Sequence, residues 1–358
     1  MTASHSQAKT AMAYQEYMQK ERHRPPTKGF QCREDIEEED HLKSVIFKCN
    51  LPHYHQQQHI LEFNCREPSC GALEGEEEGA VLSEDDYTVD PNFFDEGYSM
   101  AGSTGFKVWT GSRLLIEALT WSQDTDCDRL KEIQECVMKN DDGTRLIELG
   151  AGVGVVGTYL AAVGSHVLLT DLTTLVENAI EINLERNKRV LLSNNTSVDD
   201  ENDKLCPSWL VNGQRIGKGW ADATPLDWTK SIREQLTDEQ ASTIDFIIAS
   251  DVVFLASMMK SLFDTVEGLF QTSKDNKPSL ILSFQKRDAK DGTDSIAFTT
   301  VDGVIAAVKE RGWTIECLAW RTVAVRKEDE TGSVKDDTSE VFVFEIKDGS
   351  LSSIASTS

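Results

Sequence analysis

ELGAGVGVVG, from Glu148 to Gly157, joins two apolar segments of the chain. Glycine recurs in it as G-x-G-x-x-G at Gly152, Gly154 and Gly157. Glycines that follow a buried strand let the backbone approach a nucleotide-like ligand, although the same glycines also fit close packing between a helix and a strand. The stretch therefore predicts a strand, a tight turn and a helix, and it leaves open which ligand, if any, the turn holds.

Strand patterns and helix patterns alternate on both sides of this stretch. Strands are expected at 145–150, 166–171, 219–228, 244–254, 279–287, 313–320 and 340–347, and helices at 110–121, 153–164, 173–187, 258–271 and 297–312. Alternating strands and helices predict a parallel sheet, and the last two strands are expected to form an antiparallel pair at its end. We therefore predict an α/β, Rossmann-like sheet of seven strands with helices on both faces.

Composition divides the chain into four parts. Residues 1–40 are polar and charged and are expected to form a disordered tail, whereas 41–100 carry short strand patterns that predict a small β-rich element. The main domain is expected at 101–348, with an inserted surface loop at 190–218. Residues 349–358 are expected to form a second tail.

The chain of 358 residues is strongly acidic, with a formal net charge of −25. An acidic surface repels nucleic acid and anionic membranes and favours basic partners such as lysine-bearing proteins, although the charge also keeps a protein in solution. We therefore predict neither a nucleic-acid nor a membrane partner. The sequence shows no apolar run typical of a membrane span or a secretory signal, so a cytoplasmic location is expected, with the nucleus as an alternative.

The eight cysteines are too few and too irregularly spaced for a disulfide scaffold, and reduced thiols are expected. Residue types that could ligate zinc lie near one another in a single region: Cys49, His53, His55, His59, Cys65 and Cys70. This region lacks the paired C-x-x-C spacing that is typical of tetrahedral zinc sites. No metal is therefore predicted.

The acid that ends the second strand of the main domain, Asp171, does not identify the cofactor, because it accepts ribose hydroxyls in both dinucleotide and S-adenosylmethionine sites. Two features favour S-adenosylmethionine. The glycines begin directly after Glu148-Leu149, and a carboxylate there suits a cofactor with a cationic amino-acid end better than a pyrophosphate, which it would repel. The terminal strand pair is also expected for a methyltransferase sheet. Gly154 and Gly157 are then assigned to helix–sheet packing.

Five segments of the chain, VWTGSRLL, LIELGAGVGVVG, LLTDL, PLDW and ASDVVF, occur in the order found in one enzyme family. Because of these five segments, residues 107–347 resemble the family 16 methyltransferases. The resemblance covers about two thirds of the chain. These are seven-β-strand protein-lysine methyltransferases that modify chaperones, AAA ATPases, calmodulin and translation factors. The resemblance implies a class I methyltransferase fold, S-adenosylmethionine as cofactor, and a protein substrate with an accessible lysine.

The resemblance also implies which residues bind the cofactor. Trp109 would close over it, Asp171 would hold its ribose and Trp228 would flank its adenine. Ser250 stands where the family usually has alanine. The full predicted set is Trp109, Glu148, Gly150, Ala151, Gly152, Asp171, Trp228 and Ser250. For either tryptophan, packing in the core or at an edge is the alternative.

Asp251 and Phe254 match the acid-x-x-aromatic motif of the family at the end of the fourth strand, where ligands bind in open parallel sheets. We expect Asp251 to attract and orient the substrate ammonium, and Phe254 to line the lysine channel and contact the cation through its ring face. Tyrosine is more usual at the last position, so Phe254 lacks a phenolic oxygen there. A helix N-cap is the alternative role for Asp251, and the two roles are compatible.

The predicted function is S-adenosylmethionine-dependent protein-lysine N-methyltransferase, acting on a cytosolic protein. Methyl transfer is an in-line displacement by a neutral amine, which needs alignment, a deprotonated lysine and exclusion of water. Two alternatives stay open at this point. The acceptor could be a protein histidine or a small molecule, or the chain could be a catalytically silent binding module.

Overall fold

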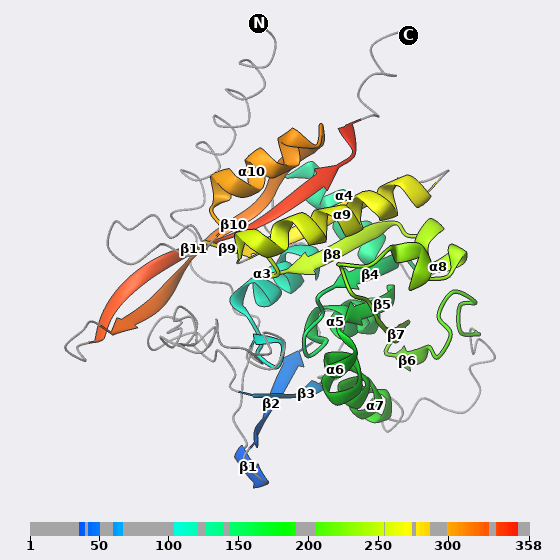
Figure 1. Cartoon of the computed structure of the whole chain (residues 1–358). Coiled ribbons are helices and arrows are strands. Elements are labelled where there is room, and N and C mark those ends of the chain that lie inside the picture. The colour runs from blue at the N-terminus through cyan, green and yellow to red at the C-terminus, as the bar shows by residue number, and fades with distance from the viewer. Residues whose placement is uncertain are drawn as a thin grey trace, which may run out of the picture.

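The computed structural model describes residues 36–39, 42–50, 60–66, 104–120, 127–138, 143–190, 205–253, 255–273, 277–286, 299–328 and 334–349. Eight strands form one sheet: β4 (Arg145–Leu149), β5 (His166–Asp171), β6 (Gln214–Ile216), β7 (Gly219–Pro225), β8 (Phe246–Ser250), β9 (Ser279–Gln285), β10 (Thr314–Glu328) and β11 (Val334–Lys347). Their order is β10-β11-β9-β8-β4-β5-β7-β6 (Figure 1). The central pairs, from β9 through β8, β4 and β5 to β7, are parallel, which confirms the predicted fold class.

Helices alternate with these strands as the sequence predicted. They are α3 (Thr110–Thr120), α4 (Asp128–Val137), α5 (Val155–Val163), α6 (Thr173–Leu175), the π-helical turn η2 (Val176–Ile180), α7 (Glu181–Val190), the 3-10 turn η3 (Ile232–Glu234), α8 (Asp238–Ser242), α9 (Ala256–Thr272) and α10 (Val301–Glu310). The sequence did not predict α4 or α8. It also read 173–187 as one regular helix, whereas the chain passes through a π-helical turn there.

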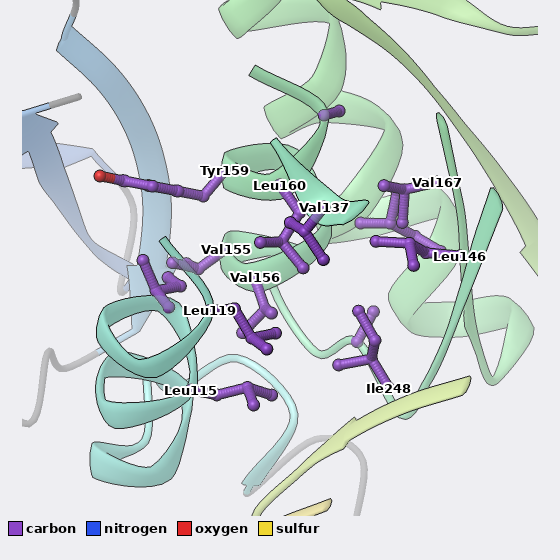
Figure 2. Packing of buried hydrophobic residues seen from close by; sticks show 14 of the residues in the cluster. Leu115, Leu119, Val137, Leu146, Val155, Val156, Tyr159, Leu160, Val167 and Ile248 are labelled. Atoms are coloured by element: carbon purple, nitrogen blue, oxygen red, sulfur yellow. The ribbon is translucent and has the colours of Figure 1, made fainter. Parts of the chain in front are cut away.

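Two apolar clusters show that helices cover both faces of the sheet. On one face, α3, α4, α5 and α7 pack on the strands, and Figure 2 shows Leu115 and Leu119 of α3 pointing toward Val156 of α5. On the other face, α8, α9 and α10 supply the buried side chains. Because both faces are covered, a strand such as β8 is buried along its whole length, which explains its apolar run Phe246–Ala249.

The sheet has one strand more than the seven predicted. The additional strand, β6, pairs antiparallel with β7 at the edge, and it lies within 190–218, which was expected to be a surface loop. Trp209 and Leu210 of the same segment are buried in the core, with 1% and 3% of their surfaces exposed. The loop interpretation was therefore wrong for β6 and for these two residues, because their polar neighbours masked their burial. The rest of 205–213 forms turns and loop, with Leu205 and Val211 exposed. Residues 191–204 lie outside the described residues.

The terminal antiparallel pair is present and is longer than predicted. β11 pairs with β9 up to Val341 opposite Gln285, and with β10 as far as Val334 opposite Glu328. Figure 1 shows this hairpin projecting from the body of the sheet. Because β9 ends at Gln285 and runs parallel to β8, the hairpin extends past the carboxyl ends of the parallel strands.

A second, antiparallel sheet contains β1 (Ile36–Glu39), β2 (Leu42–Asn50) and β3 (Ile60–Arg66), in that order. It matches the small β-element that the sequence predicted, although β1 falls within the range expected to be a tail. Leu61, Phe63 and Cys65 of β3 are buried in the same apolar cluster as α3 and α5. Figure 2 shows the Tyr159 side chain of α5 pointing toward the blue strands of this sheet. The domain boundaries stay predictions.

Within the residues that the structure describes, no helix combines the length and the apolar character that a membrane crossing needs. The same residues contain no group of three histidine, cysteine, aspartate or glutamate side chains arranged to hold a metal ion. Of the residue types considered as zinc ligands, Cys65 lies in the core, whereas His53, His55, His59 and Cys70 lie outside the described residues.

Candidate functional site

A cavity of about 300 Å³ lies at the carboxyl ends of β4, β5, β7 and β8. This edge of an open parallel sheet is where ligands bind. The sequence-predicted residues in its wall are Trp109, Gly150, Ala151, Gly152, Asp171, Trp228, Ser250 and Asp251. The fold therefore brings together predicted residues that lie far apart along the chain.

Backbone hydrogen bonds hold the turn after β4 against the end of β5. The N–H groups of Gly150 and Ala151 both donate to the Thr170 carbonyl, at 2.9 and 3.0 Å. The Gly152 N–H donates to Asp171 Oδ2 at 2.8 Å. Gly152 also has a φ of +59°, in the left-handed region that favours glycine. At its glycines the turn presents bare backbone to the cavity.

Asp171 ends β5 and contributes to the cavity wall. Its Oδ2 accepts the N–H of Gly152, and its Oδ1 accepts the N–H of Leu172 at 2.7 Å. Burial raises the pKa of Asp171 to about 6, although both hydrogen bonds favour the ionised form and act in the opposite direction. The carboxylate therefore titrates close to neutral pH, and its remaining lone pairs can accept hydrogen bonds from a ligand.

Glu148 does not line the cavity, so its predicted contact with the cofactor stays a prediction. Its side chain is fully buried, and its Oε2 accepts the Gly157 N–H of α5 at 2.8 Å. Burial raises the pKa of Glu148 to about 8. The hydrogen bond from Gly157 lowers this pKa, and the charge of Asp171 raises it by a smaller amount. The side chain joins β4 to α5, and its raised pKa disfavours the charged form that the sequence suggested.

Gly157 makes this contact possible. A Cβ atom at this position would lie 2.6 Å from Glu148 Oε2 and 2.7 Å from the Leu169 side chain. Gly154 similarly lies against Leu169 and Ile180. The assignment of these two glycines to helix–sheet packing is therefore confirmed.

The buried Glu148 carboxyl predicts a pH-dependent stability. The pKa is about 8 in the folded protein and 4.5 for an ordinary glutamate, so the folded state holds the extra proton between these values. The contribution of this proton to the free energy of unfolding is complete below pH 4.5. It is lost as the pH rises to 8, at about 1.4 kcal/mol per pH unit. In Glu148→Gln, the amide replaces the protonated carboxyl, and its oxygen can still accept the Gly157 N–H.

We therefore expect the free energy of unfolding to fall less between pH 6.5 and pH 8 in Glu148→Gln than in the wild type. Denaturant unfolding at a series of pH values measures this difference. The window starts at pH 6.5 so that the titration of Asp171 contributes little. Parallel curves for the two proteins would show that Glu148 does not hold the proton.

Both predicted tryptophans line the cavity. Trp109 directly precedes α3, and its indole N–H donates to the Thr104 carbonyl at 3.1 Å. Trp228 follows β7, and its indole nitrogen is buried without a hydrogen-bond partner among the described residues. A buried N–H that has no protein acceptor can donate to a ligand. Trp228 is therefore placed where it can contact a ligand in the cavity.

Asp251 follows β8 and is 4% exposed, with a φ of +53° that is strained for a residue other than glycine. Its Oδ2 accepts the Gly111 N–H in the first turn of α3 at 2.6 Å. Its Oδ1 accepts the Gln285 N–H at the end of β9 at 2.9 Å. The carboxylate therefore binds the N-terminus of α3 and the end of β9, and it also forms part of the cavity wall.

The Ser250 hydroxyl joins the end of β8 to α3. It lies 2.9 Å from the Ser112 hydroxyl of α3, and either oxygen can be the donor. Ser112 also lines the cavity, although it was not predicted as a site residue. Ser112 is one of several polar residues of α3, and its sequence context gives no signal for such a position.

Other wall residues were missed for similar reasons. Lys107, Leu172 and Asp227 line the cavity, and each lies within two residues of a predicted site residue, which was the signal available. Met258 of α9 also lines it, and nothing in its sequence context pointed to the site. Phe254 lies outside the described residues, so its role stays a prediction.

The cavity wall fits S-adenosylmethionine. The glycine turn leaves its backbone open to a ligand, Asp171 can accept hydrogen bonds from hydroxyl groups, and Trp228 offers an aromatic ring. A mostly parallel sheet that ends in an antiparallel pair and carries this cavity defines an S-adenosylmethionine-dependent methyltransferase.

A family model described as lysine methyltransferase, methyltransferase family 16, matches residues 95–202 and 211–299, which together exceed half of the chain. The chain therefore belongs to the lysine methyltransferase family, and S-adenosylmethionine is its methyl donor. The resemblance seen in the sequence is confirmed.

Individual relatives are more distant. EEF1A lysine methyltransferase 3 from Xenopus tropicalis is 25% identical over 206 residues, which are 57% of this chain and 74% of that protein. Calmodulin-lysine N-methyltransferase from Arabidopsis thaliana is 29% identical over 134 residues, which are 37% of this chain and 34% of that protein. A solved structure of magnesium protoporphyrin IX methyltransferase from Synechocystis is 15% identical, covers 66% of this chain and 93% of its own, and has a TM-score of 0.32.

Proposed function

We propose that this methyltransferase is a protein-lysine N-methyltransferase that acts on a cytosolic protein. The observation that carries the proposal is a buried carboxylate, Asp251, in the wall of the cofactor cavity. A carboxylate in this position can attract and orient the ammonium group of a lysine. The names of two relatives, which specify lysines of EEF1A and of calmodulin, support the same acceptor group.

The wall residues suggest how the cofactor is held. Asp171 would accept hydrogen bonds from the ribose hydroxyls, and Trp228 and Leu172 would contact the adenine. The backbone at Gly150 and Gly152 would lie along the amino-acid end of the cofactor. These assignments follow from the chemistry of each group and from its presence in the cavity wall.

Cofactor binding should depend on the ionisation of Asp171. Burial raises the pKa of Asp171 to about 6, and protonation would remove acceptor sites that the ribose hydroxyls need. We expect the affinity for S-adenosylhomocysteine to be constant above pH 7 and to fall as the pH drops through 6. Calorimetric titrations from pH 5 to pH 8 measure this change, with Asp171→Asn as the control. An equally steep pH dependence in Asp171→Asn would assign the titration to another group.

The mechanism needs little more than alignment and a dry cavity. S-Adenosylmethionine supplies a methyl group on a sulfonium; the lysine nitrogen forms a bond to the methyl carbon while the carbon–sulfur bond breaks, and the thioether leaves. Asp251 would orient the lysine as it enters, and the lysine loses its proton to solvent before transfer. Trp109 would cover the reacting atoms and exclude water.

The charge of the protein suits a basic partner. A net charge of −25 favours encounters with the positively charged surface around a target lysine, and it disfavours nucleic acid. A chaperone, an AAA ATPase or a translation factor would fit the acceptor classes that the resemblance implies.

Labelled S-adenosylmethionine and a whole-cell lysate provide the test. The purified protein should transfer label to one or a few protein bands, and acid hydrolysis should release methylated lysine. A variant with Asp251→Ala serves as the control for contaminating activity. Label in methylhistidine or in a metabolite would replace the proposal with one of the other acceptors, and no transfer by a protein that binds the cofactor would indicate a silent binding module.

A further inference from the structure

Two buried asparagines of α7, Asn183 and Asn187, hold the edge of β3. Asn187 Oδ1 accepts the Glu62 N–H at 2.8 Å, and its Nδ2 donates to the Glu62 carbonyl at 2.9 Å. Asn183 forms the same pair with Asn64, at 2.8 and 3.2 Å. Both asparagines are 0% exposed. Each side-chain amide thus takes the place of the hydrogen-bonding partner that a neighbouring strand would provide.

The two asparagines differ in their remaining hydrogen bond. Asn183 Nδ2 also donates to the Val153 carbonyl at 2.9 Å. Val153 directly follows Gly152 and is itself a residue of the cavity wall. Asn187 Nδ2 donates instead to the Asn183 carbonyl at 2.8 Å, one turn back in its own helix. Asn183 therefore connects β3 with the glycine turn, whereas Asn187 connects β3 with α7 alone.

The small sheet is firmly attached at this point. Leu61, Phe63 and Cys65 alternate with Glu62 and Asn64 along β3, and their side chains are buried in the main apolar cluster. Burial of these side chains stabilises the attachment of β3 to the main domain. A strand fixed in this way is a rigid support for the residues bonded to its edge.

We propose that the N-terminal sheet is part of the cofactor site and that Asn183 is a positioning residue for the glycine turn. Through Asn183, the backbone of β3 sets the position of the Val153 carbonyl and so of Gly152, whose N–H holds Asp171. Removing the amide leaves a buried carbonyl without its donor and allows the turn to move. This coupling rests on the cofactor site and is independent of which acceptor the enzyme methylates.

The matched variants Asn183→Ala and Asn187→Ala test the proposal. Each removes an amide that accepts one hydrogen bond and donates two, so both are expected to lower the unfolding temperature by similar amounts. We expect the dissociation constant for S-adenosylmethionine to rise about five- to tenfold in Asn183→Ala, because this variant loses one net hydrogen bond at the turn. In Asn187→Ala the dissociation constant should rise less than about twofold. Calorimetry well below the unfolding temperature of both variants measures the two constants.

Hydrogen exchange supplies a readout that does not depend on binding. Amides of 150–156 should exchange faster in Asn183→Ala than in the wild type, and at the wild-type rate in Asn187→Ala. If Asn183→Ala does not fold, Asn183→Ser and Asn187→Ser replace the pair. Equal weakening of binding in the two variants, or none in either, would overturn the proposal. Failure of the wild type to bind S-adenosylmethionine would instead contradict the cofactor site.

Discussion

Replacing Asp251 with alanine is expected to lower the rate of methyl transfer at least about 100-fold, since small displacements of positioned groups have effects of this size. The substitution removes the acceptor for the Gly111 N–H in α3 and for the Gln285 N–H in β9. It also removes the negative charge proposed to orient the substrate. Turnover on the substrate found in the lysate, expressed per folded protein, measures the change.

Asp222 provides a matched control for this experiment. It is also 4% exposed, and its carboxylate also accepts two backbone N–H groups, from Asn212 at 2.9 Å and from Ala223 at 2.8 Å. Asp222 is not a residue of the cavity wall. Asp222→Ala should therefore lose stability without a comparable loss of turnover. If both variants lose turnover equally, or if neither does, Asp251 has no special part in methyl transfer.

Replacing Gly152 with alanine is expected to weaken the binding of S-adenosylmethionine at least about tenfold, the equivalent of about 1.4 kcal/mol. The φ of +59° costs a residue with a Cβ about 1–2 kcal/mol. The new Cβ would also lie 2.9 Å from the Gly105 carbonyl oxygen, so the backbone on one side must shift. A shift of the backbone at Gly152 moves the N–H that holds Asp171. Calorimetric titration with the cofactor measures the loss.

Gly312→Ala is a control that introduces backbone strain outside the cofactor site. The φ of Gly312 is +73°, and a Cβ added there would have no atom within 4 Å. Gly312→Ala thus introduces a similar strain outside the cavity wall and should lower stability while leaving cofactor binding unchanged. Equal cofactor affinities for the two alanine variants would mean that the glycine turn tolerates a side chain at Gly152.

The sequence predicted those parts of the fold that depend on local periodicity. The strands β4, β5 and β8 are short, mainly apolar and bounded by polar or glycine residues, so their positions could be predicted from the local sequence. Asp171 was predicted because it ends a strand, and the carboxyl ends of parallel strands meet at one edge. Ser250 was predicted only through the family resemblance. The strand β6 was missed because its own three residues, Gln214–Ile216, show no apolar pattern.

The features of the site that the sequence could not reveal arise from contacts between distant segments. Glu148 looks like a charged ligand-binding residue in the sequence, and its full burial against Gly157 becomes visible only when α5 is packed on β4. The contact from Asp251 to Gly111 spans 140 positions, so no local pattern could reveal it. Asn183 and Asn187 read as ordinary polar positions of a surface helix until β3 lies beside them.

The paired asparagines have a consequence for self-association. Strands at the edge of a sheet expose unpaired N–H and C=O groups that can pair with strands of other chains, which leads to aggregation or domain swapping. At Glu62 and Asn64 these groups are already satisfied by Asn187 and Asn183. The helix α7 therefore covers an edge of β3 that could otherwise pair with a strand of another chain. Variants that lose either amide should form oligomers more readily as the protein concentration rises.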